Sequence, residues 1–272
     1  MPFLLPLVIF MCAVFVVPMA FVIGTAFVQE GTHQFTLQFF ERFFSNELYL
    51  RVLYTTLEIA FVSTAVTLLL GYPLAYYLAA QPPRKRIYLS MLLLLPFYTS
   101  ILVKSFAFSV ILGHQGLVNA IIRFFFGEGA GLELLHNRVG VIIGITHDML
   151  PFLVFPILVS LLAQDPALHR AAEIMGAGRL RIFWKVTFPL SLPGLLAGVF
   201  LVVIRAMGQY AVPALLGGRQ DMMMANLVGF HISQVLDWNM AAAISLVLLG
   251  VSAIFLVALG RVRGGDLLGS RS

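Results

Sequence analysis

Six stretches of this sequence are long and apolar enough to cross a lipid bilayer as helices, and they restrict its fold more than any other feature. A spanning helix needs about 20 mostly apolar residues. The chain is 60% hydrophobic and 11% charged, with a mean hydropathy of +0.98, whereas a soluble domain needs far more polar surface. We therefore predict an all-α membrane protein with spans at residues 3–28, 52–78, 87–112, 139–162, 193–216 and 240–259.

The first apolar stretch, residues 3–28, also has the position of a secretory signal. A signal peptide begins with a basic region and has an apolar core of only about 7–15 residues. Residues 3–28 have no basic region before them and a much longer apolar run, so we interpret them as a retained span.

Basic residues predict the orientation of the spans, because cytoplasmic connections are enriched in Lys and Arg. Ten of the 17 basic residues lie in the connections after spans two and four and in the C-terminal tail, against five in the other connections. We therefore expect both termini and the connection after span four in the cytoplasm.

The connection after span four, residues 164–192, has the pattern of two short, ordered helices. Asp165 and Pro166 predict an N-cap acceptor followed by a proline at the first helical position. Gly176 predicts a left-handed stop. A second helix is expected over 179–188, closed by Pro189 and Pro193. Phe183 and Trp184 beside arginines indicate a surface for a protein partner, and a basic hairpin lying on anionic lipid is the alternative.

The spacing of this connection resembles the "EAA" loop of binding-protein-dependent ABC importer permeases. The resemblance rests on Ala171-Ala172, Gly176-Ala177, Phe183, Val186, Pro189 and Pro193-Gly194. It extends over nearly the whole chain and is greatest to the spermidine/putrescine type, through residues 54–57, 70–75, 95–97, 150–152 and 208–218. Arg170 replaces the leading Glu of the family's motif, with Glu173 one helical turn later.

The resemblance implies a type I (MetI-like) permease with one transmembrane domain over residues 1–272, whose cytoplasmic loop docks on an ATPase. The ATPase-coupling residues that it implies are Arg170, Ala171, Ala172, Glu173, Gly176, Ala177, Arg179, Phe183 and Trp184. It further implies an ABC ATPase dimer that carries the ATP and Mg, a second permease subunit, homologous or identical, and a substrate-binding protein. This chain would itself bind no cofactor and would not be an enzyme. The resemblance also implies that the protein lies in the inner membrane of a bacterial cell.

Two of the connections on the opposite side also carry apolar residues. Phe35–Leu50 is amphipathic, with Phe39, Phe40, Phe43, Phe44 and Tyr49. The segment Leu117–Leu135 predicts a short helix followed by a Gly-rich turn. Both segments suit a rim that receives the binding protein, and for the first an aromatic belt that anchors the spans is the alternative.

Four ionisable residues fall within apolar segments: Glu58, Lys104, Asp148 and Arg205. Each would cost about 2.5–3.5 kcal/mol at a helix centre, so we expect them to face protein or a watery cavity. They either pair with one another to fix the helix packing or line a translocation path. For a cationic solute, Glu58 and Asp148 would supply counter-charge, and aromatic rings would contact an ammonium group. The candidate path residues are Tyr54, Glu58, Tyr98, Lys104, Asp148 and Tyr210.

Small residues and prolines within the spans predict how the helices pack. The pairs Gly140/Gly144 and Gly194/Gly198 allow close helix approach. Prolines 73, 96, 151 and 213 each remove a backbone donor and predict kinks around a central space.

The function predicted is half of the translocation path of an ATP-driven importer for a small, polyamine-like solute. The alternative is an ion-coupled secondary transporter or channel, in which Glu58, Asp148 and His147 would relay protons. The histidines do not recur at metal-ligand spacing, and Cys12 is the one cysteine, so we predict no metal site. With no phosphate-binding glycine loop and its basic residues concentrated on one side of a membrane, the chain is not expected to bind nucleotide or nucleic acid.

Overall fold

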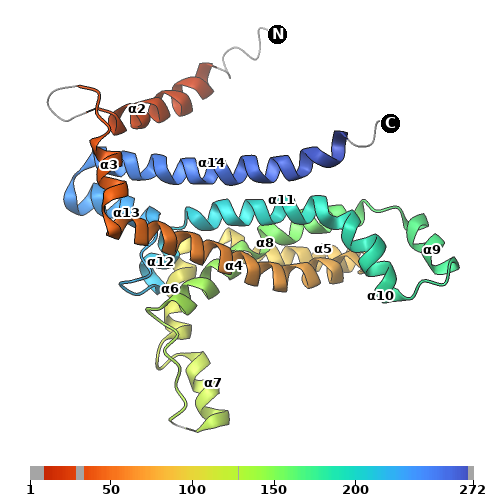
Figure 1. Ribbon diagram of the computed structural model, residues 1–272. Coiled ribbons are helices and arrows are strands. Elements are labelled where there is room, and N and C mark those ends of the chain that lie inside the picture. Colours follow the sequence, from red (N-terminus) through yellow and green to blue (C-terminus); the bar gives the residue numbers. More distant parts are fainter. Residues whose placement is uncertain (1–8, 29–33, 128, 269–272) are drawn as a thin grey trace.

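The computed structural model describes residues 9–28, 34–127 and 129–268, and for 258–268 it describes the backbone only. These residues form helices joined by short turns, with one isolated bridge between Val28 and Phe35 (Figure 1). The helices are η2 (Cys12–Val16), α2 (Val17–Ala26), α3 (Gln38–Ser45), α4 (Glu47–Ala79), α5 (Pro83–Leu94), η3 (Leu95–Tyr98), α6 (Ile101–Leu112), α7 (Leu117–Phe126), α8 (Arg138–Leu162), α9 (Pro166–Ile174), α10 (Arg179–Ile182), η4 (Phe183–Thr187), α11 (Phe188–Met207), α12 (Ala211–Leu216), α13 (Met224–Phe230), η5 (His231–Val235) and α14 (Trp238–Leu268). The all-α fold class is confirmed.

Helices α4, α8 and α11 pack against one another and hold the larger hydrophobic core. Their approach is close because glycines lie at the contacts. A Cβ added at Gly71 would meet Leu153 at 2.8 Å, and one added at Gly194 would meet the Pro156 carbonyl oxygen at 2.4 Å. These three helices are therefore closely packed and form the centre of the bundle.

A second core joins the end of α2 to α3, α13 and α14. Phe39, Phe43 and Tyr49 are buried in it, and only Phe44 of the predicted aromatic group is largely exposed. The interpretation of Phe35–Leu50 as an aromatic belt in the membrane interface is therefore wrong for these three buried side chains. The face of α3 that carries Phe39 and Phe43 packs toward α14 instead of lipid, because these apolar positions are four residues apart, about one helical turn.

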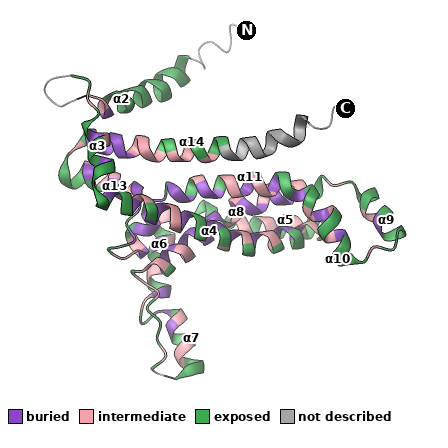
Figure 2. Cartoon of the chain, in the orientation of Figure 1, coloured by how far each residue is buried: buried purple, intermediate pink, exposed green. Residues whose placement is uncertain are grey.

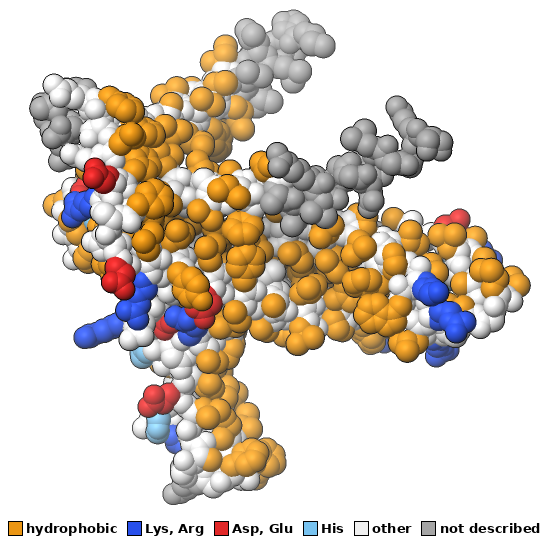
Figure 3. Space-filling view, in the orientation of Figure 1, with side chains coloured by type: hydrophobic (Ala, Val, Ile, Leu, Met, Phe, Trp, Pro, Cys, Tyr) orange, Lys and Arg blue, Asp and Glu red, His pale blue; other side chains and the backbone are white. Residues whose placement is uncertain are grey.

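On the face shown in Figure 3, apolar side chains cover the middle of the bundle, and charged side chains gather toward its two ends. Six helical stretches of the described chain are long and apolar enough to cross a membrane: Ile9–Ala26, Glu47–Ala79, Ile101–Phe126, Arg138–Leu162, Arg179–Met207 and Trp238–Val257. The first is almost wholly exposed, as the green ribbon of α2 shows (Figure 2). Multiple membrane-spanning helices are therefore present.

The third predicted span, residues 87–112, is wrong as one helix. The chain forms α5, narrows to the 3₁₀ turn η3 and is extended at Thr99 and Ser100 before α6 begins. Pro96 lies in the 3₁₀ turn, where it cannot donate a helical hydrogen bond. The Thr99 hydroxyl donates to the Pro96 carbonyl at 2.7 Å and stabilises the break.

The fifth predicted span, residues 193–216, is wrong at both ends. Its helix runs continuously from Arg179 to Met207, and a break at 208–210 separates it from α12. Pro213 could not donate a helical hydrogen bond to the Gln209 carbonyl, so it favours a break here. At the other end, Pro189 does not close the second loop helix, because the widened turn η4 directly precedes it.

The remaining spans agree better with the sequence. The fourth begins one residue before its predicted start, and the sixth continues as helix α14 to Leu268, beyond its predicted end. Part of the first predicted span, residues 3–8, lies outside the described residues. Proline 73 and proline 151 remain inside continuous helices.

The later part of α14 extends toward the end of the bundle at which α9 and α10 lie (Figure 1). Helices α3, α7, α12 and α13 lie toward the other end.

Candidate functional site

The loop between α8 and α10 is an ordered element with caps at both ends of α9. The Asp165 carboxylate accepts a hydrogen bond from the Ala167 amide at 2.8 Å, and Pro166 is at the first helical position. Gly176 has φ +79°, and the amide of Ala177 donates to the Ala172 carbonyl at 3.0 Å. Together with the bond from the Gly176 amide to the Glu173 carbonyl, this forms a Schellman motif. The predicted N-cap and left-handed stop are confirmed.

The tip of this loop exposes apolar and basic side chains together. Ile174 and Met175 are 86% and 79% exposed, and Leu180 and Trp184 are also exposed. Of the predicted coupling residues, Arg170, Ala171, Glu173, Gly176 and Arg179 are exposed, Ala177 is half-buried and Ala172 is buried. Apolar side chains in water beside cations form a surface suited to a protein partner.

Phe183 differs from the other predicted coupling residues because it points into the protein. Its ring lies edge-on to those of Tyr72 and Tyr76 of α4, at centroid distances of 6.1 and 5.5 Å. Trp184, its neighbour, is 58% exposed. Phe183 therefore anchors the loop to α4, and Trp184 remains available at the surface.

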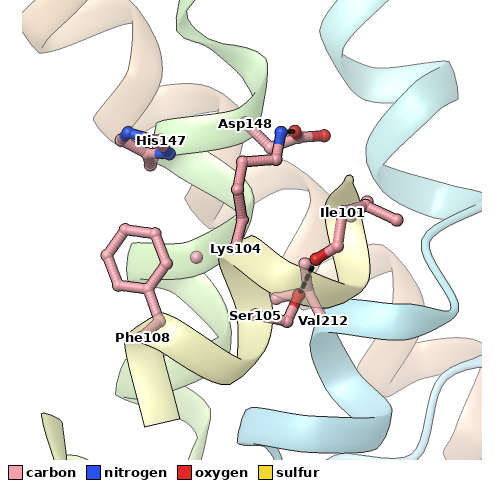
Figure 4. Close-up of a pocket in the computed structure, with 8 residues that line it drawn as sticks. Ile101, Lys104, Ser105, Phe108, His147, Asp148 and Val212 are labelled. Carbon is pink, nitrogen blue, oxygen red and sulfur yellow. Dashed lines mark hydrogen bonds and ion pairs between the residues drawn. The ribbon is translucent and has the colours of Figure 1, made fainter. Parts of the chain in front are cut away.

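Inside the bundle, Lys104 of α6 forms an ion pair with Asp148 of α8 (Figure 4). The second carboxylate oxygen of Asp148 accepts from the Gln209 amide at 3.1 Å. Both charged side chains are largely buried. His147 points to the other side of Lys104 and packs against Phe108 (Figure 4). This group joins α6, α8 and the break after α11, as the ion-pairing interpretation of these residues predicted.

Glu58 of α4 is paired with Arg138, the first residue of α8, at 2.6 Å. The same guanidinium contacts Asp221 at 3.1 Å, and Asp221 accepts from the Gly218 amide. Two carboxylates on one guanidinium leave this group with a net charge of −1. Glu58 and Arg138 are each about one-third exposed, so the group is accessible to water.

The three candidate tyrosines are all surface residues. Tyr98 and Tyr54 are 83% and 67% exposed, and Tyr210 is half-exposed with its ring over Gly229. Tyr54 lies one turn before Glu58 on the same face of α4. Arg205, the fourth ionisable residue of the spans, lies 4.1 Å from the ring centroid of Phe152. Among the described residues, no group of His, Cys, Asp and Glu could hold a metal ion.

Sequence reasoning missed Arg138, Asp221, Gln164, His169 and Thr187. Arg138 carried a usable signal, because a base in the first turn of a helix opposes the helix dipole and needs an acidic partner. Asp221 and Gln164 lie in connections, His169 lies in α9 and Thr187 lies in η4, and each has a partner that is distant in sequence. No spacing rule links such positions.

Comparison with known proteins agrees with this geometry. Residues 2–262 match the family model "binding-protein-dependent transport system inner membrane component". The chain is 32% identical over 249 residues to the spermidine/putrescine transport system permease protein PotB of Escherichia coli (strain K12), covering 90% of each protein. It is 29% identical over 206 residues to the molybdenum transport system permease protein ModB of Mycobacterium tuberculosis, covering 75% of this chain and 76% of that one.

The fold also resembles a solved transporter. A bacterial ABC transporter involved in the import of the acidic polysaccharide alginate superposes with a TM-score of 0.77 at 17% identity. The superposition covers 96% of this chain and 93% of that one. A second structure of an alginate transporter, in complex with a periplasmic protein bound to an alginate pentasaccharide, gives a TM-score of 0.74 at 17% identity.

Proposed function

The chain belongs to the family of binding-protein-dependent transport system inner-membrane components, and from this premise we propose that it forms half of the path by which an ATP-driven importer takes up a polyamine-like solute. As a member of this family it is a permease subunit of an ABC importer, in the inner membrane, and not itself an enzyme. The alternative of an ion-coupled secondary transporter is thereby set aside.

The observation that carries the proposed mechanism is the capped, exposed loop α9–α10. A loop held by an N-cap and a Schellman motif keeps its shape when a partner grips it, whereas a floppy loop would absorb the partner's motion. We assign this surface to a cytoplasmic ATPase dimer that carries the ATP and Mg. With six spans, both chain termini would then also lie in the cytoplasm. A second permease, identical or homologous, would complete the path.

The polyamine class is supported by the similarity to PotB and by the charge of the group around Arg138. Glu58, Arg138 and Asp221 have a net negative charge and are partly open to water. A solute ammonium group can replace the guanidinium at Glu58, with the exposed ring of Tyr54 beside it. In this proposal Tyr98 and Tyr210 also contact the solute, while Lys104 and Asp148 hold the helices around the path.

Reconstitution tests this proposal. The chain is expressed with the ATPase, permease and binding protein encoded beside it, purified, and placed in proteoliposomes. We expect the ATPase to copurify and radiolabelled spermidine to accumulate only with ATP, with competition by putrescine and none by molybdate. Purification without an ATPase would contradict the coupling role. ATP-driven uptake of molybdate but not of spermidine would contradict the solute class.

A further inference from the structure

Helix α9 is only weakly packed against the bundle, although the proposed function requires it to transmit movement. Ala172 is its one buried side chain in the described structure. A cleft separates it from the ends of α4 and α8, lined in part by Tyr76, Ala79 and Glu173. Hydrophobic burial therefore contributes little to holding α9 in place.

Two hydrogen bonds to one residue connect α9 and its N-terminal turn to the fifth span instead. The Gln164 side-chain amide donates to the Thr187 carbonyl at 2.9 Å. The His169 Nε2 atom lies 3.1 Å from the Thr187 hydroxyl oxygen. Thr187 is 5% exposed, and Gln164 and His169, which line the cleft, are half-buried, so the two bonds are partly buried.

Thr187 is the last residue of the widened turn η4, directly before the helix that crosses the membrane. A carbonyl oxygen has two lone pairs, so that of Thr187 can accept from Gln164 without losing a bond within its own helix. The hydroxyl is likewise free to face His169. The turn therefore presents both polar groups of one residue to α9.

The same turn is held on its other side by α4. The ring of Phe183 packs on Tyr72 and Tyr76, and the Tyr72 hydroxyl lies 2.9 Å from that of Ser191. The turn η4 is thus fixed between α9 and α4. The chain that connects α9 to the fifth span bends at Gly176 and Gly178. We therefore expect a displacement of α9 to reach the fifth span through the contacts of Thr187.

We propose that Thr187 is a positioning residue that binds α9 to the fifth span, so that movement of the docked helix is passed to the membrane segments. This inference rests on the proposed function, because it requires an ATPase on α9. It adds the specific contact by which the loop moves the span.

The test uses the complete importer in proteoliposomes and measures solute taken up per ATP hydrolysed. The double variant Gln164→Met/Thr187→Val removes both contacts while retaining side-chain volume. We expect its uptake per ATP to fall at least about fivefold, with ATP hydrolysis maintained, because the two hydrogen bonds that connect α9 to Thr187 are lost. The single variant Thr187→Ser, in which Gln164 is unchanged, keeps the hydroxyl. It should have nearly the wild-type ratio of solute taken up to ATP hydrolysed.

A matched control removes a different side-chain hydrogen bond to the fifth span. The Ser160 hydroxyl of α8 donates to the Leu190 carbonyl of α11 at 3.2 Å and does not involve α9. Ser160→Ala should leave the ratio unchanged. The inference is overturned if the double variant has the wild-type ratio, or if it no longer assembles with the ATPase, since Thr187 would then only shape the docking surface. Failure of the wild-type chain to bind an ATPase would instead contradict the proposed function.

Discussion

Among single residues, Gly176 has the strictest conformational requirement in the loop that we assign to the ATPase. Its φ of +79° is strained for any residue with a Cβ, and about 1–2 kcal/mol is lost when such a residue adopts it. We expect Gly176→Val to abolish uptake while membrane insertion is retained, because the Schellman motif would open. Uptake in cells and the amount of protein in the membrane fraction provide the measurement.

Gly178 offers the matched control for this prediction. It has a φ of −68°, and a Cβ added there would meet no atom within 4 Å. Gly178→Ala should therefore transport normally. Equal loss of uptake in both variants would show that uptake does not depend on the left-handed backbone conformation at Gly176.

The buried pair of Lys104 and Asp148 makes a prediction about stability. Removal of one partner leaves an uncompensated charge, which typically costs about 3–5 kcal/mol, whereas removal of both costs far less. We expect Lys104→Met to lower the thermal unfolding midpoint in detergent markedly, and Lys104→Met/Asp148→Leu to recover much of the loss. If the loss of unfolding midpoint in the double variant equalled the sum of the losses in Lys104→Met and Asp148→Leu, the two residues would act independently.

His231 makes the stability of the protein depend on pH. Burial lowers the pKa of His231 below its usual 6.5, with a smaller lowering effect from Arg42 opposed by Asp237. The folded state therefore binds this proton less readily than the unfolded state. The stabilisation is complete above pH 6.5 and is lost as the pH falls toward the folded-state pKa.

The measurement is the unfolding midpoint between pH 8 and pH 5, for the wild type and for His231→Gln. Gln can still bond the Tyr49 hydroxyl, which lies 3.3 Å from His231 Nε2. We expect the midpoint of the wild type to fall more steeply below pH 6.5 than that of the variant. Parallel curves for the two proteins would contradict the assignment to His231.

At the scale of helices, close packing of α8 and α11 depends on Gly194. An added Cβ would lie 2.4 Å from the Pro156 carbonyl oxygen and 2.5 Å from the Ser160 Cβ. We expect Gly194→Ala to destabilise the protein by about 1–3 kcal/mol, as overpacking does. Gly250→Ala is the control, because nothing lies within 4 Å of its Cβ position. Equal free energies of unfolding for the two variants would contradict close packing of α8 and α11 at Gly194.

The ends of the helices could be predicted from the sequence where they coincide with the ends of apolar runs. They were harder to predict where a proline lies within the apolar run. The fourth span agrees almost to the residue, since both its ends coincide with the ends of the apolar run. Pro96 and Pro213 lie at breaks, while Pro73 and Pro151 lie inside continuous helices. Whether a proline breaks a helix depends on neighbours that satisfy the freed carbonyl, and these are set by tertiary contacts.

The candidate site divides in the same way. The caps of α9 involve residues two to five positions apart and could be predicted. The bonds of Thr187 to Gln164 and of Arg138 to Glu58 join positions far apart in the sequence. Such contacts exist only once the helices have packed, so no local pattern reveals them.

For the whole molecule, the account depends on α9–α10 contacting an ATPase while the opposite end of the bundle does not. Met175 is exposed at the loop tip, and Leu132, also exposed, lies in the connection between α7 and α8 at the other end. Each position can carry a photo-crosslinking amino acid in the assembled importer. The two positions thus compare the ends of one molecule under identical conditions.

The most direct measurement is the identity of the crosslinked product at these two positions, recorded together with ATP-dependent uptake. We predict an adduct with the ATPase from position 175, none from position 132, and uptake that stops when the adduct forms. An importer that accumulates solute with no ATPase adduct at position 175, or with one at position 132, would contradict the account.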